Sequence, residues 1–276
     1  MLRAGKLVAF PTETVYGLGA NALDEAAVRS IYEAKGRPSS SPLIVHVASI
    51  AMARELASEW AEQAGELANS FWPGPLTIVV PKKPHVPDIV TAGYPSVGLR
   101  MPAHPVAIAL LKAAGIPVAA PSANRFTQLS PTTAEHVREA FPDILTLDGG
   151  PCTVGIESTV ISLAGQIPRI LRPGMIMQSR IEQVIGPVEA GAGPESPGQH
   201  PRHYSPRTKI ILGTAPQEGR GVRLNLPDDP NQYAEQLYAK LHALDHQGYD
   251  WIAIELPPDT PEWAGIRDRL QRGASK

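Results

Sequence analysis

Short apolar runs alternate with segments of helical periodicity along most of the chain. Such runs, bounded by proline, glycine or polar residues, predict strands that are buried on both faces of a sheet. In the first two thirds of the chain they occupy residues 7–10, 43–47, 76–80, 97–100, 116–120, 144–147, 159–161 and 170–172. Strands that alternate with helices predict an α/β fold.

The intervening segments have apolar positions at helical spacing. One follows Asp24, a candidate N-cap, and another runs from Pro105 to Ala114. Residues 50–71 predict two consecutive helices, and a further helix should begin at residues 130–132.

The composition divides the chain into three parts. Residues 1–186 should form a large domain, and residues 207–276 predict strand, strand, helix, strand and helix, enough for a small α/β domain. Residues 187–206 are rich in proline and glycine and predict a linker. Because the second half of this linker contains histidine, arginine and tyrosine, we expect it to lie over a site as a lid.

Composition and charge narrow the class of protein. The 276 residues are 43% hydrophobic and 19% charged, with a net charge of −2, which is typical of a soluble globular protein and gives no global case for nucleic-acid binding. The single cysteine, Cys152, excludes an intramolecular disulfide and a thiolate zinc site. No apolar run suits a signal peptide or a membrane span, so we expect a cytoplasmic protein with no membrane partner.

Candidate chemistry lies at strand ends, where α/β proteins bind ligands. The first run leads into Pro11-Thr12-Glu13-Thr14-Val15-Tyr16-Gly17, which is either a polar turn or part of a site. Arg100 ends another run, and its planar fork suits a carboxylate. A second arginine, Arg172, ends the last run.

Two further segments could contact an anion or a nucleotide. Lys35-Gly36-Arg37-Pro38 and the serines up to Ser41 combine cations, glycine and hydroxyls, as an anion-binding loop does. The alternative is a basic helix end that complements the helix dipole. Ser122 and Asn124 could donate to phosphate, ribose or base, or could bond their own backbone.

Other chemistries find no support in the sequence. There is no G-x-x-x-x-G-K-[ST] loop and no G-x-S-x-G elbow. His242 and His246, and likewise His200 and His203, lack a third ligand, so we expect surface histidines and no protein metal site. Cys152 should be buried filler. Without a protein nucleophile, catalysis would proceed by positioning substrates and charge.

Seven motifs occur in the order typical of the YrdC/Sua5 family. They are Pro11-Thr12-Glu13-Thr14-Val15-Tyr16-Gly17-Leu18-Gly19, Lys35-Gly36-Arg37-Pro38, Trp72-Pro73-Gly74-Pro75-Leu76-Thr77, Arg100-Met101-Pro102, Pro121-Ser122-Ala123-Asn124, Glu157-Ser158-Thr159-Val160 and Arg172-Pro173-Gly174. Over residues 1–186 the chain therefore resembles this family, and the remainder resembles its two-domain Sua5 type, with a shortened C-terminal domain.

The resemblance implies a twisted open mixed α/β sheet with a basic cavity, a linker and a small α/β C-terminal domain. It also implies L-threonylcarbamoyladenylate synthesis, in which ATP, L-threonine and bicarbonate give threonylcarbamoyl-AMP and pyrophosphate. A separate transferase complex would then modify adenosine 37 of tRNA, and the protein itself would bind tRNA at most weakly. Mg²⁺ would arrive with ATP, carried mostly by the phosphates.

The resemblance also implies roles for residues at matching positions. L-threonine would bind Thr14, His46, Arg100 and Ser158. ATP would bind Lys35, Arg37, Ser41, Ser122, Asn124, Arg172 and Tyr204, with Lys35 and Arg37 positioning its phosphates and Tyr204 closing over it.

Two alternatives belong to other classes of function. An RNA-binding module could grip tRNA in the basic cavity without turnover, although the chain is acidic and has no basic stripe interleaved with aromatic residues. A relative of carbamoyltransferases could make a carbamoyl adenylate, although the single cysteine leaves no zinc-finger-like segment.

Overall fold

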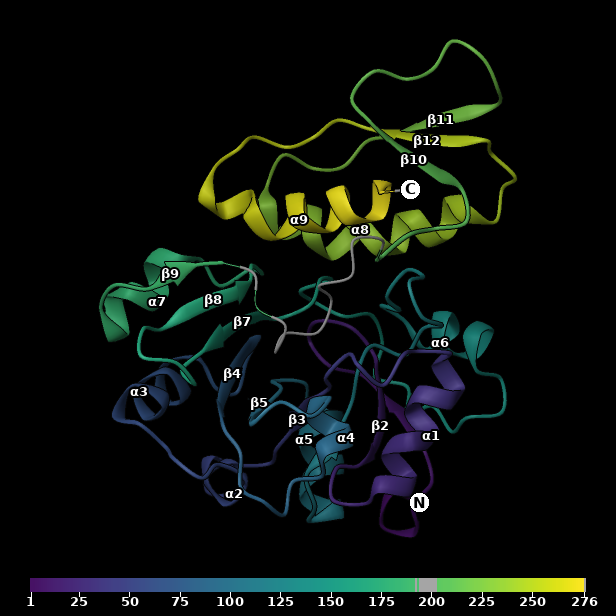
Figure 1. Cartoon of the computed structure of the whole chain (residues 1–276). Helices are drawn as coiled ribbons and strands as arrows, with labels where there is room; N and C mark the ends of the chain where they lie inside the picture. The colour runs from purple at the N-terminus through teal and green to yellow at the C-terminus, as the bar shows by residue number, and fades with distance from the viewer. Residues whose placement is uncertain (192, 194–202, 276) are drawn as a thin grey trace.

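The computed structural model describes residues 1–191, 193 and 203–275, which form two domains with a β-sheet each (Figure 1). The nine-stranded sheet of the large domain has the strand order β1-β2-β6-β3-β5-β4-β7-β8-β9. Its strands are β1 (Val8–Phe10), β2 (Gly17–Asn21), β3 (Ile44–His46), β4 (Leu76–Pro81), β5 (Ser96–Arg100), β6 (Val118–Ala119), β7 (Thr159–Ser162), β8 (Arg169–Arg172) and β9 (Glu189–Ala190). The pairs β3–β5, β4–β7 and β8–β9 are parallel and the other neighbours are antiparallel, so the predicted mixed sheet is confirmed.

Helices cover both faces of this sheet. They are η1 (Leu2–Ala4), α1 (Glu25–Lys35), α2 (Ile50–Leu56), α3 (Glu62–Phe71), α4 (Asp88–Thr91), α5 (Pro105–Ala114), α6 (Ala134–Ala140) and α7 (Gln178–Ile185). Strand side chains alternate between the faces. Val8 and Phe10 share one core with Leu111 of α5, whereas Ala9 belongs to a second core with Ile31 of α1.

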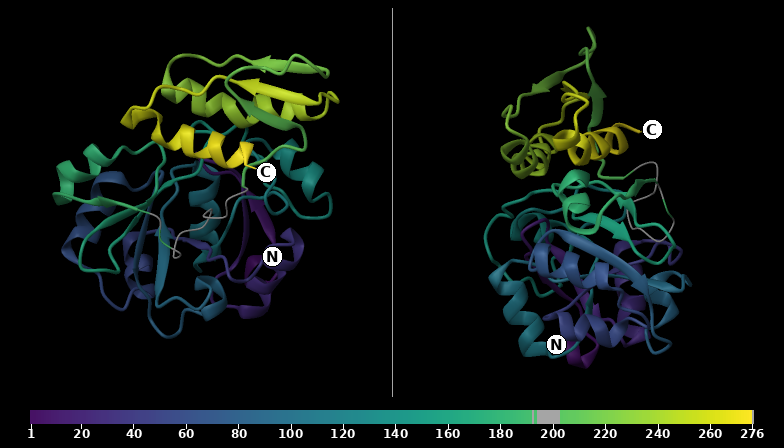
Figure 2. Two further views of the ribbon diagram at one scale, coloured as in Figure 1. Left: turned by 45° about the horizontal axis from the view of Figure 1, so that its top comes forward. Right: turned by 90° about the vertical axis from the view of Figure 1, so that its left-hand side faces the viewer.

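The small domain has three parallel strands and two long helices. Strand β12 (Trp251–Ile254) lies between β10 (Lys209–Leu212) and β11 (Gly221–Leu224). Helices α8 (Pro230–Asp245) and α9 (Ala264–Ala274, preceded by the turn η2, Pro261–Trp263) lie between this sheet and the large domain (Figures 1 and 2).

One hydrophobic core crosses the boundary between the domains. Val15 and Ile156 of the large domain belong to the same buried cluster as Leu237 of α8 and Leu270 of α9. Burial of apolar side chains is the main favourable term in folding and in association. The two domains therefore share part of their folding energy, and α8 and α9 are held against the large domain.

Several predicted elements are confirmed and others are wrong. The helix at 105–114 has the predicted bounds, Asp24 caps α1, and the segment 50–71 contains two helices. The predicted strand at 144–147 is reduced to one bridge at Thr146, and the helix expected from residue 130 begins at Ala134. The first part of the expected linker adds strand β9 to the sheet edge.

Strand β2 and helix α7 were missed for identifiable reasons. Two of the five residues of β2 are glycines, which weaken strand propensity. Gly19 is nevertheless required, because a Cβ there would lie 2.8 Å from the Phe10 ring and 2.9 Å from Val118. Helix α7 has Ile181, Val184 and Ile185 at helical spacing, but its eight residues make only about two turns and adjoin the proline- and glycine-rich segment.

No helix in the described residues combines the length and the apolar character needed to cross a membrane.

Candidate active site

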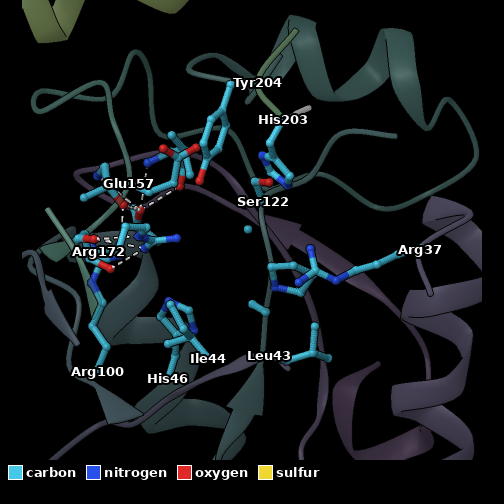
Figure 3. A pocket seen from close by; sticks show the side chains of 17 residues that line it. Arg37, Leu43, Ile44, His46, Arg100, Ser122, Glu157, Arg172, His203 and Tyr204 are labelled. Atoms are coloured by element: carbon cyan, nitrogen blue, oxygen red, sulfur yellow. Dashed lines mark hydrogen bonds between the residues drawn. The ribbon is translucent and has the colours of Figure 1, made fainter. Parts of the chain in front are cut away.

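A cavity lies among the ends of the central strands of the large sheet (Figure 3). Eight of the residues predicted from the sequence line it: Thr14, Arg37, His46, Arg100, Ser122, Ser158, Arg172 and Tyr204. Figure 3 shows Arg37 on one side of the open space and Arg100 and Arg172 on the other. These residues come from segments far apart in the sequence; the strand order of the sheet brings most of them together, and the segment between the domains adds Tyr204.

Three predicted residues, Lys35, Ser41 and Asn124, do not line the cavity but contact residues at or next to its wall. Lys35 Nζ donates to the carbonyl oxygen of Ser122 at 2.6 Å and also to that of Asn124. Ser41 accepts a hydrogen bond from the Arg37 guanidinium at 2.5 Å. The Asn124 amide donates to the carbonyl oxygens of Arg125 and Gln128, so it shapes its own loop. Their contacts place Lys35 and Ser41 as supports of the cavity wall.

Arg100, at the end of β5, contacts the segment that follows β1. We call Arg100, Glu13 and Thr14 the Arg100 corner. Its Nη2 lies 2.7 Å from Glu13 Oε1, its Nη1 donates to Thr14 Oγ1 at 2.9 Å, and its Nε donates to the Gly74 carbonyl at 3.2 Å. Glu13 Oε2 also accepts from the Ala103 backbone N–H at 3.0 Å. Both charged side chains are buried, so each charge depends on the other to offset its desolvation.

Arg172, at the end of β8, organises the entrance of β7. Its Nε and Nη2 donate to the Ser158 carbonyl at 3.1 and 3.0 Å, and Nη2 also donates to Ser158 Oγ at 3.1 Å. Ser158 Oγ lies 2.8 Å from Thr77 Oγ1 of β4. The Ser158 hydroxyl is thereby oriented by groups from two strands, β8 and β4.

The Lys35–Arg37 segment carries buried positive charge on the side of the cavity opposite Arg100 and Arg172 (Figure 3). Arg37 contacts neutral groups, Ser41 and the Pro42 carbonyl, and its ring neighbour is Phe126 at 5.9 Å. Burial lowers the pKa of Arg37 to about 10. Burial, and next the neighbouring Arg37 and Arg125, hold the pKa of Lys35 well below its usual range. Such shifts mark a place where an anion would relieve the cost of buried charge.

Two buried imidazoles line the cavity in the neutral form. Burial, and next Arg100, lower the pKa of His46 to about 3. Burial, followed by Arg37 and Lys35, lowers the pKa of His203. The Nδ1 atoms of both rings have no hydrogen-bond partner within the described part of the chain. Both rings can therefore accept or donate one hydrogen bond from or to a ligand.

His203 and His242 correct the expectation of surface histidines. His203 is buried in the cavity wall, where its ring lies 4.1 Å from that of Tyr204. The His242 ring stacks on His136 of α6 at 3.8 Å and contacts the Ser130 carbonyl at 3.1 Å, so it belongs to the domain interface. Only His246 is exposed, as expected; His200 lies outside the described residues. Buried Cys152 agrees with the prediction.

Tyr204 approaches the cavity from the segment that joins the domains. Its backbone adopts φ 60°, a left-handed conformation that is uncommon for a residue with a side chain. Its ring is buried and its hydroxyl has no partner among the described residues. Burial raises the pKa of this hydroxyl, so it stays a neutral donor over the cavity.

Sequence reasoning gave no role to two charged residues at this site. Glu157 lines the cavity, and Arg269 of α9 lies behind it, with Nε 2.7 Å from Glu157 Oε2. Glu157 belongs to one of the seven motifs, and Arg269 belongs to the C-terminal part that resembles the Sua5 type. The family resemblance was therefore the one available signal. Nothing in the amphipathic pattern of α9 shows that an arginine is buried there.

The cavity has more cations than anions. Arg37, Arg100 and Arg172 line it, whereas Glu13 and Glu157 are engaged with Arg100 and Arg269. A cationic hollow with low-dielectric walls concentrates anionic ligands. The described residues contain no group of three or more histidine, cysteine or acidic side chains arranged to hold a metal ion.

Fold and site together define an α/β protein with a cationic cavity at the ends of its strands, of a kind suited to small anionic ligands. Comparisons with known proteins narrow this class. A model of the Sua5/YciO/YrdC family, described as telomere recombination, matches residues 1–174, and a model described as threonylcarbamoyl-AMP synthase, C-terminal domain, matches residues 176–275. The chain belongs to the Sua5/YciO/YrdC family.

Individual relatives cover both domains. A threonylcarbamoyl-AMP synthase of Bacillus subtilis is 41% identical, covering 99% of this chain and 91% of the relative. The structure of Pyrococcus abyssi Sua5 complexed with L-threonine has 39% identity and a TM-score of 0.94, covering 99% of this chain and 92% of that one. E. coli YciO, at 22% identity and a TM-score of 0.54, shares the fold of the large domain over 63% of this chain.

Proposed function

We propose that this protein is a threonylcarbamoyl-AMP synthase that condenses ATP, L-threonine and bicarbonate and releases pyrophosphate. The observation that carries the proposal is the arrangement of three buried arginines around one cavity: Arg100 is paired with Glu13, whereas Arg37 has no acidic partner within residues 1–191, 193 and 203–275. One substrate has a carboxylate and the other a triphosphate, so two distinct anion sites are what the reaction requires. Relatives with this name match the whole chain.

The threonine would occupy the corner formed by Thr14, Arg100 and Ser158. Arg100 would offer the substrate carboxylate the Nη N–H groups that Glu13 and Thr14 leave unused, and the hydroxyls of Thr14 and Ser158 are fixed by hydrogen bonds to their neighbours. His46 stays neutral, so its Nδ1 can accept a hydrogen bond from the substrate ammonium. This arrangement would direct the amine toward the open space.

The triphosphate would occupy the opposite wall beside Arg37. The guanidinium of Arg37 supplies positive charge, and Ser41 and the Pro42 carbonyl fix its direction. Lys35 holds the Ser122 and Asn124 carbonyls, so it would set the loop against the nucleotide. Tyr204 would close over the nucleotide, and Arg172 would contact it.

The chemistry would need no protein nucleophile. The threonine ammonium would first lose a proton to solvent. The free amine then attacks the carbon of bicarbonate, water leaves, and the resulting carbamate oxygen attacks the α-phosphorus of ATP as pyrophosphate leaves. Fixed cations near the α-phosphate and the leaving group stabilise charge as it develops, and the walls keep reactants close. Buried walls also protect the carbamate and the mixed anhydride from water.

Mg²⁺ and macromolecular partners are part of the proposal. Mg²⁺ would enter with ATP and keep its water ligands, because it is reluctant to dehydrate and needs few protein carboxylates. We expect the product to pass to a tRNA threonylcarbamoyl transferase complex in the cytoplasm, with weak tRNA binding at most by the enzyme itself.

Pyrophosphate release tests this function. Purified protein with ATP, Mg²⁺ and bicarbonate should release pyrophosphate only when L-threonine is added, and the rate should saturate with its concentration. Release that does not depend on L-threonine would contradict the proposal, and salt-dependent RNA binding without turnover would favour the RNA-binding alternative.

A further inference from the structure

Arg269 on α9 has the largest fully buried side chain of the described residues. Its Nε lies 2.7 Å from Glu157 Oε2, its Nη2 donates to the Glu157 carbonyl at 3.2 Å, and its Nη1 donates to the Pro173 carbonyl at 3.0 Å. Asp268 lies 2.8 Å from Nη1. One guanidinium therefore bonds two segments of the other domain at once, as its rigid fork allows.

Those two segments carry cavity residues. Glu157 directly precedes Ser158 at the entrance of β7, and Pro173 directly follows Arg172 at the exit of β8. Arg172 and Ser158 already bond each other within the cavity wall. Arg269 thus bonds the entrance of β7 and the exit of β8 on the side away from the cavity, and these strand ends carry Ser158 and Arg172, which line it.

Two glycines permit this contact. A Cβ on Gly265, one turn before Arg269, would lie 2.9 Å from the Gly174 backbone. A Cβ on Gly174 would lie 2.5 Å from the Thr159 nitrogen. Backbones this close hold α9 at the depth at which the guanidinium reaches Glu157 and Pro173.

Arg269 also neutralises a carboxylate that lines the cavity. Glu157 Oε2 contacts Arg269 and accepts from the Tyr238 hydroxyl at 3.2 Å, and Oε1 accepts from Ser130. Without Arg269 this carboxylate would keep only neutral hydrogen-bond donors, and its negative charge would face the triphosphate from the wall that holds Ser158 and Arg172. Its field would repel the triphosphate across a low-dielectric cavity.

We propose that Arg269 is a positioning residue for the synthase reaction: it fixes the entrance of β7 and the exit of β8 and cancels the charge of Glu157, so that helix α9 completes the substrate site. The inference rests on the proposed function. It assigns to the small domain a share in the active site that goes beyond support of the fold.

Three variants separate the two effects of Arg269. R269M should raise the KM for ATP about 30-fold or more and lower kcat about tenfold, because a buried unpaired carboxylate then faces the triphosphate. E157Q/R269M should bring the KM for ATP within about threefold of the wild type, since no charge is left unpaired, while kcat stays low. G265A should lower kcat with little change of KM, because it displaces α9 but keeps both charges.

Arg267 provides the matched control on the same helix. It contacts Asp259 at 3.3 Å and the Pro257 carbonyl, both within the small domain. R267M should stay within about twofold of the wild type in kcat and KM, as is usual for a substitution away from the site.

All rates are measured at a temperature below the Tm of every variant, so that only folded protein is compared. If Arg269 only stabilised the fold, R269M would have a lower Tm and the KM of the wild type. An unchanged KM for ATP in folded R269M, or a double variant as poor in KM as R269M, would overturn the inference. If R269M does not fold, the inference is tested by kcat of E157Q/R269M and of G265A: both values should be lower than in the wild type, and wild-type values would overturn it. If the wild type itself releases no pyrophosphate, the proposed function fails, and calorimetric ATP binding to the same proteins still tests Arg269.

Discussion

The two sides of the cavity treat buried charge in opposite ways. On one side Arg100 is paired with Glu13 at 2.7 Å and hydrogen-bonded to Thr14, so its charge is balanced before any substrate binds. On the other side, among the residues that the structure describes, Arg37 and Lys35 contact neutral groups, and burial lowers the pKa of each. The Arg100 side is neutralised by an ion pair within the protein, whereas the Arg37 side carries positive charge that an anionic ligand could neutralise.

This difference has a consequence for stability and for binding. Removing one member of a buried pair leaves the other uncompensated, which destabilises the fold. Removing an uncompensated cation relieves a desolvation cost, so the fold tolerates it and only the anion affinity is lost. The paired side should thus matter for both folding and threonine binding, and the unpaired side should matter mainly for ATP.

The largest effect is expected for R100A. Loss of the buried pair should cost about 3 to 5 kcal/mol of folding stability because Glu13 stays buried without its cation. The KM for L-threonine should rise about 100-fold or more, because the fork for the carboxylate is lost. Chemical denaturation and threonine-dependent pyrophosphate release measure the two effects.

A matched control uses an exposed ion pair in the same domain. Arg138 on α6 contacts Glu135 and Asp148 at 3.2 Å, with about half of its side chain exposed. R138A should change stability by less than about 1 kcal/mol. An R100A protein as stable as R138A would refute the view that the Arg100 corner is neutralised by an ion pair.

The sequence predicted the members of the cavity better than their organisation. Strand-end arginines such as Arg100 and Arg172 could be found because an arginine after an apolar run is a local signal. Arg269 could not, because its burial depends on how α9 packs against the other domain. Strand β2 was missed because glycines that fit beside Phe10 resemble a turn when seen one residue at a time.

The same limit applies to the histidines. His203 and His242 have no local pattern that separates a surface position from a buried one. His203 is buried because it lies in the segment that joins the domains, and His242 is half-buried because α8 faces α6. The contacts of His242 join residues more than a hundred positions apart. Propensity and periodicity carry no information on such contacts.

The second largest effect is expected for R37M. The KM for ATP should rise about tenfold to 100-fold, in line with the loss of a charge-assisted hydrogen bond worth about 1.5 to 3 kcal/mol. Tm should stay the same or increase, because the buried charge is removed. R37K serves as the control, since it keeps a charge and loses the fork. A Tm reduction in R37M as large as in R100A would break the comparison between the two sides.

The smallest effect is a pH dependence of stability that arises from Lys35. Its folded-state pKa lies below the unfolded value, so the unfolded state binds more protons, and stability rises as pH increases toward the ordinary lysine range. The slope is at most about 1.4 kcal/mol per pH unit. Denaturation of the ligand-free protein between neutral pH and about pH 9.5 should show this rise in the wild type and not in K35M. Equal slopes in both proteins would contradict the assignment of buried charge to Lys35.

Incorporation of radiolabelled bicarbonate tests most directly that both substrates meet in one cavity. The account predicts that label appears in a nucleotide product only when ATP and L-threonine are both present, and that R100A and R37M each reduce it. Labelled nucleotide formed without L-threonine, or none formed with all three substrates present, would contradict the account.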